Sequence, residues 1–404
     1  AHVMMTNFMI YPLGILGFWL CGFALMFGGL GGIATLGGNA VLDGAKFELF
    51  PVFSIFGTKG FMLGSGVYDV SVFAMFLFQM VFMDTTATIP TGSMAERWRF
   101  LPFCLFSFAV GAIIYPLYGM WVWGGGWLAA LGKNFGLGHG HVDFAGSSVV
   151  HLCGGTLALV CAKLLGPRIG KFNEDGSPNP IPGHNIPMAF VGTFVLAFGW
   201  FGFNAGSTLA GTDAQIGIIA VNTMLASAAG AVAAMTITWM KFGRPDPSFL
   251  CNGMLAGLVA VTAPCAFIDS WAAIMIGAVA GVLVLFSAIF VEEKLKIDDP
   301  VGAFSVHGAN GLWGVLALGL FANGKYGDGW NGVAGKVTGF FYGDASQFVA
   351  QFIGAITCML YVAAAGYCTF RMIGTVVAHR SPPEDELGGL DIPEMGAVAY
   401  PDDV

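Results

Sequence analysis

Long apolar stretches separated by short polar segments run through almost the whole chain. Ten of them are long enough to form helices that cross a bilayer, which takes about 20 apolar residues. Their predicted bounds are 8–29, 69–91, 99–122, 143–166, 186–207, 214–240, 249–268, 270–292, 301–323 and 346–376. The pattern therefore predicts an all-α polytopic membrane protein, with a membrane domain over residues 1–376 and a polar C-terminal tail over residues 377–404.

Composition agrees with this fold class. Of 404 residues, 56% are hydrophobic and 10% are charged, against about 25% charged in a typical soluble domain. A chain this apolar could not cover a water-exposed surface with polar groups. Nothing in it is basic enough for nucleic acid. The eight cysteines have no metal-ligand or disulfide spacing and are expected to be small apolar packing residues.

Two glycine-rich segments interrupt the pattern. Residues 30–68 are too long for a bare loop and are expected to contain short local structure. Residues 324–344 form a second such loop. No cleavable signal peptide is visible.

Basic residues are distributed unequally between the two ends of the predicted helices, and such a bias sets orientation in a membrane. Five lie on one side: Lys46, Lys59, Lys133, Lys325 and Lys336. Eleven lie on the other: Arg97, Arg99, Lys163, Arg168, Lys171, Lys241, Arg244, Lys294, Lys296, Arg371 and Arg380. The side with more basic residues is predicted to be cytoplasmic, and the C-terminal tail is then cytoplasmic too. The expected location is the plasma or inner membrane of the cell.

Segments 143–155 and 299–311 have similar sequences. They share five positions in register: Asp143/Asp299, Gly146/Gly302, Val150/Val306, His151/His307 and Gly155/Gly311. The first lies in the fourth predicted span and the second in the ninth, so they run in opposite directions. A shared pattern in opposite directions indicates an inverted repeat with a site near the midplane between its halves.

The repeat also bears on the number of helices. Spans five to nine make a half of five helices followed by a C-terminal helix, whereas the first half shows four. Because an inverted repeat needs an odd number of helices in each half, we expect one more span before residue 1, eleven in all, with the N-terminus outside.

His151 and His307 are the main candidates for function. Ionisable groups inside a membrane are costly and usually face the protein interior or a cavity. A lone histidine is more often a satisfied core residue, but two at equivalent repeat positions can meet at the pseudo-twofold axis. A neutral pair in which one ring donates and the other accepts suits a small solute that can do both.

Aromatic residues near the outer ends of spans two, three and five are a second set of candidates. Phe82, Trp123 and Phe203 could hold a small cation by cation–π attraction of roughly 0.5–2 kcal/mol, and the Ser207 hydroxyl could accept a hydrogen bond from it. The alternative is that these rings only pack or form an interfacial belt, and the residues alone do not choose between them.

Several long motifs occur in order along residues 1–400. They are Ala95-Glu96-Arg97, Trp121-Val122-Trp123-Gly124-Gly125-Gly126, Asp143-Phe144-Ala145-Gly146 through His151, Gly199-Trp200-Phe201-Gly202-Phe203-Asn204-Ala205-Gly206-Ser207, Asp298-Asp299-Pro300 through His307-Gly308, and Gly389-Leu390-Asp391. With these motifs the chain resembles the ammonium transporter family (Amt/Mep, and more distantly Rh).

The resemblance implies a role for each candidate. Phe82, Trp123 and Ser207 would form an outer ammonium recruitment site supported by Asp143, either structurally or by its electric field. Phe82 and Phe203 would form a stacked gate, and His151 and His307 the twin histidines of the pore. The resemblance also implies a homotrimer in membrane lipid, no cofactor, and a PII-type signalling protein at the cytoplasmic face.

Two features depart from the family pattern. Asp84 follows Phe82 inside a span and is either a second cation or proton site, or a group that caps a neighbouring helix or pairs with Thr and main-chain groups. Met395 stands where the family usually has His, which puts regulation through the tail in question. Glu384, Asp385 and Glu386 make that tail acidic and solvated.

Three readings of function follow. The first is an ammonium transporter or channel; the second is an ammonium sensor that signals to a partner or a fused kinase; the third and weakest is a gas channel of Rh type. No hydrolase triad, phosphate-binding loop or metal-ligand cluster in the sequence indicates an enzyme.

Overall fold

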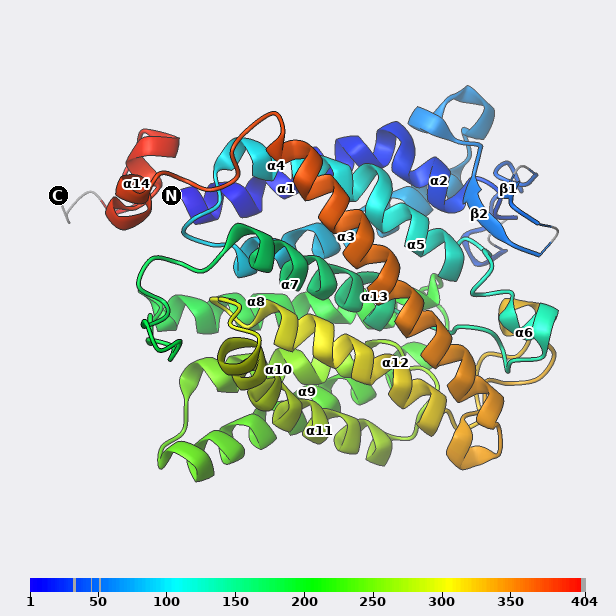
Figure 1. Cartoon of the computed structure of the whole chain (residues 1–404). Coiled ribbons are helices and arrows are strands. Elements are labelled where there is room, and N and C mark those ends of the chain that lie inside the picture. The colour runs from blue at the N-terminus through cyan, green and yellow to red at the C-terminus, as the bar shows by residue number, and fades with distance from the viewer. Residues whose placement is uncertain (32–33, 45, 51, 401–404) are drawn as a thin grey trace.

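The computed structural model describes residues 1–31, 34–44, 46–50 and 52–400. These residues form a bundle of long helices (Figure 1). In chain order the helices at the predicted spans are α1–η1–α2 (His2–Gly17, Phe18–Gly22, Phe23–Phe27), α3 (Val70–Ser93), α4–η5–α5 (Phe100–Ala109, Val110–Ile114, Tyr115–Val122), η6–α7 (Ser147–Leu152, Cys153–Leu165), α8–η7 (Ile186–Asn204, Ala205–Thr208), α9 (Gln215–Phe242), α10 (Pro247–Thr262), α11–η8 (Ser270–Ile289, Phe290–Lys294), η9–α12 (Phe304–Ala309, Asn310–Phe321) and α13 (Ala345–Gly374).

Within the described part of the chain, nine of these helices are long and apolar enough to cross a membrane, and α10 is a shorter apolar helix. The span predicted over 249–268 is therefore too long. Helix α10 ends at Thr262 because Pro264 follows, which has no N–H and disfavours helical geometry before it. The carbonyls of Thr262 and Ala263 accept instead from the N–H groups of Ala145 and Phe144. The first span also begins earlier than predicted, at His2.

The long helices lie side by side, and α13 crosses the bundle obliquely (Figure 1). The β1–β2 hairpin (Lys46–Glu48, Ser54–Gly57) and the short helix α6 (Leu131–Phe135) lie at one end, and α14 (Pro383–Gly388) lies at the other. The prediction of short local structure within 30–68 is confirmed by this antiparallel hairpin, whose Phe47 and Phe56 rings stack at 4.8 Å. The hairpin is a small addition to an otherwise helical fold.

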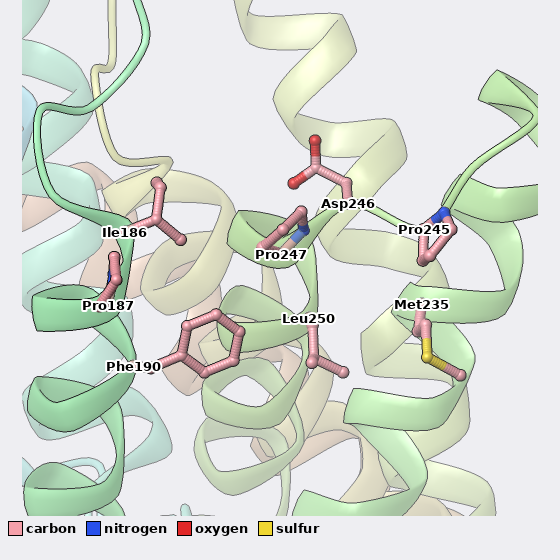
Figure 2. Close-up of a pocket in the computed structure, with 8 residues that line it drawn as sticks. All are labelled: Ile186, Pro187, Phe190, Met235, Pro245, Asp246, Pro247 and Leu250. Atoms are coloured by element: carbon pink, nitrogen blue, oxygen red, sulfur yellow. The ribbon is translucent and has the colours of Figure 1, made fainter.

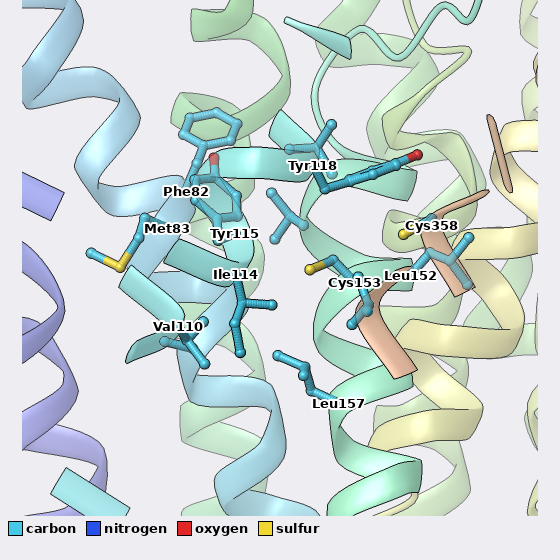
Figure 3. Close-up of a cluster of buried hydrophobic side chains, with 14 of the residues drawn as sticks. Phe82, Met83, Val110, Ile114, Tyr115, Tyr118, Leu152, Cys153, Leu157 and Cys358 are labelled. Carbon is cyan, nitrogen blue, oxygen red and sulfur yellow. The ribbon is translucent and has the colours of Figure 1, made fainter. Parts of the chain in front are cut away.

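The main core lies where α3, α5, η6–α7 and α13 meet (Figure 3). Phe82, Tyr115 and Tyr118 are among the largest fully buried side chains there. Tyr118 donates its hydroxyl hydrogen to the carbonyl of Gly354 on α13, which satisfies the polar end of a buried ring. Cys153 and Cys358 are buried in the same cluster, in agreement with cysteines used for apolar packing.

Charged residues from several loops meet at the end of the bundle that carries α14. Arg168 forms hydrogen bonds to both carboxylate oxygens of Asp298 and an ion pair with Glu96. Arg97, fully buried, donates to the carbonyls of Gly166 and Asp298. The basic residues predicted to follow the second and fourth spans thus lie together at one end of the molecule.

Candidate functional site

His151 and His307 meet inside the bundle. Their Nδ1 atoms are 3.1 Å apart, and the rings are nearly parallel, with centroids separated by 5.2 Å. Two ring nitrogens at this distance form a hydrogen bond only if one carries a proton and the other does not. His151 is fully buried, and its Nε2 has no hydrogen-bond partner among the described residues. The predicted meeting of the two histidines is therefore observed.

Main-chain geometry around the histidines is unusual in the same way in both halves. His151 lies in the π-helical turn η6 and His307 in the π-helical turn η9, each leading into an α-helix. π-Helical turns are rare and occur often at functional sites. Each turn widens the helix where it presents its imidazole toward the other half.

Glycines allow these two helices to approach closely. A Cβ atom on Gly155 would lie 2.2 Å from the main-chain nitrogen of Gly308, and one on Gly311 would lie 2.6 Å from the carbonyl oxygen of Ser147. Because Gly155 and Gly311 occupy equivalent positions in the repeat, the two contacts are related by the pseudo-symmetry. The histidines face one another because nothing larger than glycine separates the helices at these positions.

Asp143 and Asp299 cap the starts of the two histidine-bearing helices. Asp143 Oδ1 accepts from the N–H groups of Gly146 and Ser147, and Asp143 Oδ2 accepts from those of Ser148 and Val149. Asp299 accepts in the same way from the N–H groups of two residues at the start of η9. An Asp that satisfies unpaired N–H groups at a helix start is a stabilising cap. The repeated Asp thus has a structural role in both halves.

The glycine three residues after each Asp makes the capping turn possible. Gly146 has φ +112° and Gly302 has φ +71°, in the left-handed region that favours glycine. The conserved spacing of Asp, Gly and His within the repeat therefore reflects one local design: a cap, a left-handed turn and a π-helical turn that carries the imidazole.

Aromatic rings continue from the histidine pair toward the end of the bundle that carries β1–β2. Phe203 lies 5.5 Å from the His151 ring and stacks on Phe82 at 4.2 Å. Trp123 contacts the edge of Phe82, with centroids 5.7 Å apart. Its indole N–H donates to the carbonyl of Asp143 at 2.6 Å, so the capping residue also fixes the orientation of this ring.

Ser207 lies one helical turn after Phe203 and donates its hydroxyl to the carbonyl of Phe203 at 2.7 Å. The hydroxyl hydrogen is thereby used within the helix end, and the oxygen lone pairs are what Ser207 can offer to a cation. A continuous column of rings thus runs through the site, in the order Trp123, Phe82, Phe203, His151 and His307. The rings come from the end of α5, from α3 and α8, and from the π-helical turns η6 and η9.

Comparison with known proteins identifies the family of this chain. The family model described as Ammonium Transporter Family matches residues 1–400. The chain belongs to the ammonium transporter family. Ammonium transporter Amt2 of Archaeoglobus fulgidus is 46% identical over 403 residues, which cover 99% of this chain and 81% of that protein. Ammonium transporter Amt1 of Haloferax mediterranei is 37% identical, covering 100% of this chain and 73% of that protein.

Solved structures place the fold in the same family. A structure titled Sensor Amt Protein has a TM-score of 0.81 and 34% identity, covering 97% of this chain and 89% of that one. Mep2 of Saccharomyces cerevisiae has a TM-score of 0.78 and 25% identity, covering 95% and 80%. The predicted membership of an ammonium transporter family, with a multi-pass membrane fold and not an enzyme, is therefore confirmed.

Trp200 is a site residue that the sequence did not single out. Its ring stacks on His151 at 5.2 Å and lies 5.6 Å from Phe203, and its indole N–H donates to Thr262 Oγ1. Its position in the sequence could have identified it. Trp200 lies in the Gly199–Ser207 motif of this ammonium transporter family member, three residues before Phe203, and residues three apart lie on the same face of a helix.

A cavity of about 250 Å³ lies on the other side of the histidine pair. His307 and Trp200 line it together with polar side chains from α1, α3 and α10, namely Asn7, Thr85, Thr88, Thr91 and Asn252. The polar groups are already linked, because Thr88 and Thr91 both donate to Asn7 Oδ1 at 3.0 Å. His307 is thus in contact with a cavity that polar and apolar side chains both line.

Asp84 lies on α3 near Gly14 of α1 and is not part of the ring column. Its Oδ1 atom is buried and has no hydrogen-bond partner among the described residues. The neighbouring Thr85 and Thr86 donate instead to carbonyls of their own helix, and Thr88 donates to Asn7. The alternative that Asp84 satisfies these threonines is therefore not observed.

A different pocket, of about 570 Å³, lies between α8, α9 and α10 (Figure 2). Its lining is mostly apolar, with Phe190, Met235 and Leu250 pointing into it, and Asp246 is the charged residue at its edge. The Asp246 carboxylate caps α10 by accepting from the N–H of Phe249. None of the histidines or aromatic site residues lines this pocket, so it is separate from the site.

Proposed function

We propose that this protein is an ammonium transporter that recruits ammonium at Trp123, Phe82 and Ser207 and passes it as ammonia between Phe82 and Phe203 and along His151 and His307. The observation that carries the proposal is the continuous ring column that ends in the hydrogen-bonded histidine pair. The names of the relatives support ammonium as the solute.

The physical argument begins with charge. An ammonium ion loses its hydration when it enters an apolar passage, and a cation without compensating partners pays a large free-energy penalty there. Aromatic faces and the Ser207 oxygen offset part of that penalty at the outer site. The stacked Phe82 and Phe203 rings offer no hydrogen bonds, so the species that passes them most readily is neutral ammonia. An ammonium-evoked current would show that the released proton also crosses.

The histidine pair then receives a molecule that both donates and accepts. The shared Nδ1 proton leaves the Nε2 atoms, of which that of His151 has no protein partner, to face the passage. One Nε2 can accept from ammonia and the other can donate to it. The inner cavity next to His307 provides water-sized polar space for release.

The assembly and orientation are part of the same proposal. We infer a homotrimer in the plasma or inner membrane, surrounded by lipid, with the tail in the cytoplasm. The grouping of Arg97, Arg99 and Arg168 at the end of the bundle that carries α14 supports the orientation. The same face would receive a PII-type signalling protein.

The test replaces His151 and His307 by Ala, singly and together, in protein reconstituted on a supported membrane. We expect the ammonium-evoked current of the double variant to fall at least about tenfold, since the hydrogen-bonded pair lines the passage. His184→Ala, in an exposed loop, is the matched control and should leave the current unchanged. Unchanged current and ion selectivity in the double variant would refute the role of the pair.

The sensor is a second candidate, because a structure titled Sensor Amt Protein is similar over 97% of this chain. A sensor would keep the outer site and the ring column while carrying little flux. The two functions are separated by measuring ammonium binding and current on the same sample. Binding with neither a current nor rescue of growth on low ammonium in a transporter-deficient strain would favour the sensor, whereas rescue of growth would favour the transporter.

A further inference from the structure

His141 is a fully buried imidazole that the proposed passage does not use. It lies in the loop before η6, two residues before Asp143, and none of its surface is exposed. Its Nε2 is 2.9 Å from Ser148 Oγ, and Ser148 Oγ donates to Asp143 Oδ2 at 2.7 Å. The three side chains form one chain of hydrogen bonds that ends on the capping carboxylate.

The direction of this chain follows from its donors and acceptors. The Asp143 carboxylate accepts from four main-chain N–H groups and from Ser148, so it acts as an acceptor only. The Ser148 hydroxyl has a single hydrogen and gives it to Asp143. Its oxygen can then only accept from the imidazole, so the proton of His141 is on Nε2.

The other ring nitrogen explains why this arrangement is costly. His141 Nδ1 is buried without a hydrogen-bond partner among the described residues, and it packs against Gly354 of α13, where a Cβ atom would lie 2.1 Å away. A buried acceptor left unpaired lowers stability.

Asp143 connects the chain to the outer site through its main chain. The carbonyl oxygen of Asp143 accepts from the indole N–H of Trp123, and the Trp123 ring contacts Phe82. One residue thus carries both the carboxylate that Ser148 contacts and the carbonyl that orients Trp123. This couples a buried loop histidine to an aromatic ring of the outer site.

We propose that His141 is a positioning residue for the outer cation site: through Ser148 it holds Asp143 in place and, through Asp143, the ring of Trp123. The inference rests on the proposed function and adds a residue to its site. It predicts that His141 affects how tightly ammonium is recruited and leaves the maximal rate nearly unchanged.

The surroundings of His141 predict a distinct pH dependence. Burial lowers the pKa of His141 to about 4, opposed by the negative charge of Asp143. Neutral polar side chains also pack on this loop. They include Gln347, Gln351, Ser346 and Cys358 of α13, Tyr118 of α5, and Asn331, whose amide donates to the carbonyl of His141. An imidazolium at this position places a positive charge near the cation site, so recruitment weakens as the outer pH approaches 4.

Three variants separate the hydrogen bond from packing. His141→Phe keeps a ring without the donor, His141→Gln keeps an N–H donor near the position of Nε2, and Ser148→Ala removes the middle of the chain. His139→Gln is the matched control, since His139 is also buried in this loop but its Nε2 faces the carbonyl of Gly335. Each variant is first checked for folding by size-exclusion chromatography.

Ammonium-evoked currents and tryptophan fluorescence titrations with ammonium supply the readouts. We expect His141→Phe to raise the half-saturating ammonium concentration about tenfold, as for the loss of one hydrogen bond in a charged network, with a maximal current within about twofold of wild type. His141→Gln and His139→Gln should remain near wild type. The weakening near pH 4 should vanish in His141→Gln.

The double variants decide between positioning and packing. In the Ser148→Ala background, His141→Phe and His141→Gln should give the same half-saturating concentration, because the chain through which they differ is gone. A difference that persists there overturns the proposal and assigns His141 to packing against Gly354. Should His141→Phe fail to fold, the same comparison is made with Ser148→Ala alone, and unchanged recruitment in that variant overturns the proposal.

The two proposals fail in distinguishable ways. Ammonium binding with neither current nor rescue of growth in wild type contradicts transport, but the effect of His141 on binding still tests the positioning role. Normal current in wild type with no change in His141→Phe contradicts the positioning role alone.

Discussion

At the residue scale, two aspartates in apolar sequence have opposite surroundings. Asp143 accepts five hydrogen bonds from its own loop and helix start. Asp84 has a buried oxygen with no partner among the described residues and faces Gly14 of α1. In the sequence both are ionisable groups in apolar surroundings. Only their neighbours in space show that Asp143 caps a helix and that Asp84 has a buried oxygen without a partner among the described residues.

Replacing Asp84 by Leu should stabilise the protein by about 1–2 kcal/mol, because it removes a poorly compensated ionisable group from a membrane helix. The same change should lower the ammonium-evoked current, since ionisable groups kept in membranes at a cost in stability commonly serve function. Thermal unfolding and current recordings measure the two effects.

Asp299→Ala is the contrasting variant. It removes the cap of η9 and should destabilise by about 1 kcal/mol. A stable and fully active Asp84→Leu protein would remove Asp84 from the transport path, and a destabilised one would show that its carboxylate has a partner.

At the element scale, the decisive feature is the crossing of η6–α7 with η9–α12. The inverted repeat predicted this pairing, and five shared positions were enough to find it. The π-helical turns were not predicted, because their wider hydrogen-bond ring depends on which main-chain groups the neighbouring helix leaves unpaired. The sequence also did not predict which helix Gly155 and Gly311 contact, because a close approach depends on the positions of two segments that are distant in the chain.

Substitution at the crossing tests this account. Gly155→Ala places a Cβ atom against the main-chain nitrogen of Gly308, at 2.2 Å without adjustment. We expect a loss of about 1–3 kcal/mol of stability from overpacking, together with a reduced current as the histidine rings separate. Gly192→Ala on α8, where a Cβ atom meets nothing within 4 Å, is the control and should have wild-type stability and current. Equal melting temperatures for the two variants would contradict a crossing packed this tightly.

At the scale of the whole molecule, the tail, which contains α14, lies against one end of the helix bundle (Figure 1). His379 stacks on Phe370 of α13 at 3.6 Å, its Nε2 donates to the carbonyl of Phe370, and its Nδ1 accepts from the indole N–H of Trp98. The indole can only donate, so this contact needs a neutral imidazole. Of the three acidic tail residues predicted to be solvated, Glu384 is exposed, whereas the Glu386 side chain is buried against Arg380 and accepts from the N–H of Ile169.

Acid should therefore loosen the tail. Burial lowers the pKa of His379 below its usual 6.5 in the docked state, so the released state binds the proton more readily. Docking is then strongest above about pH 6.5 and weakens as the pH falls below it, by at most about 1.4 kcal/mol per pH unit.

Hydrogen exchange of residues 377–400 at pH 5 and pH 8 measures this effect. His379→Phe, which cannot titrate, should abolish the difference, and His184→Gln should keep it. Equal exchange in wild type at both pH values would exclude His379 as the titrating group.

The membrane class, the positions of nearly all the helices, the repeat and the two histidines were predictable from the sequence, because hydrophobic length and repeated spacing are local properties of the chain. Family resemblance added the solute and the aromatic rings. Only the tertiary structure decided that Asp143 is a cap, that Asp84 lacks a partner for its buried oxygen, that Trp200 stacks on His151, and that His141 reaches Trp123 through two other residues. Each of these depends on atoms brought together from distant segments, and the free energy of a buried polar group is set by the atoms around it.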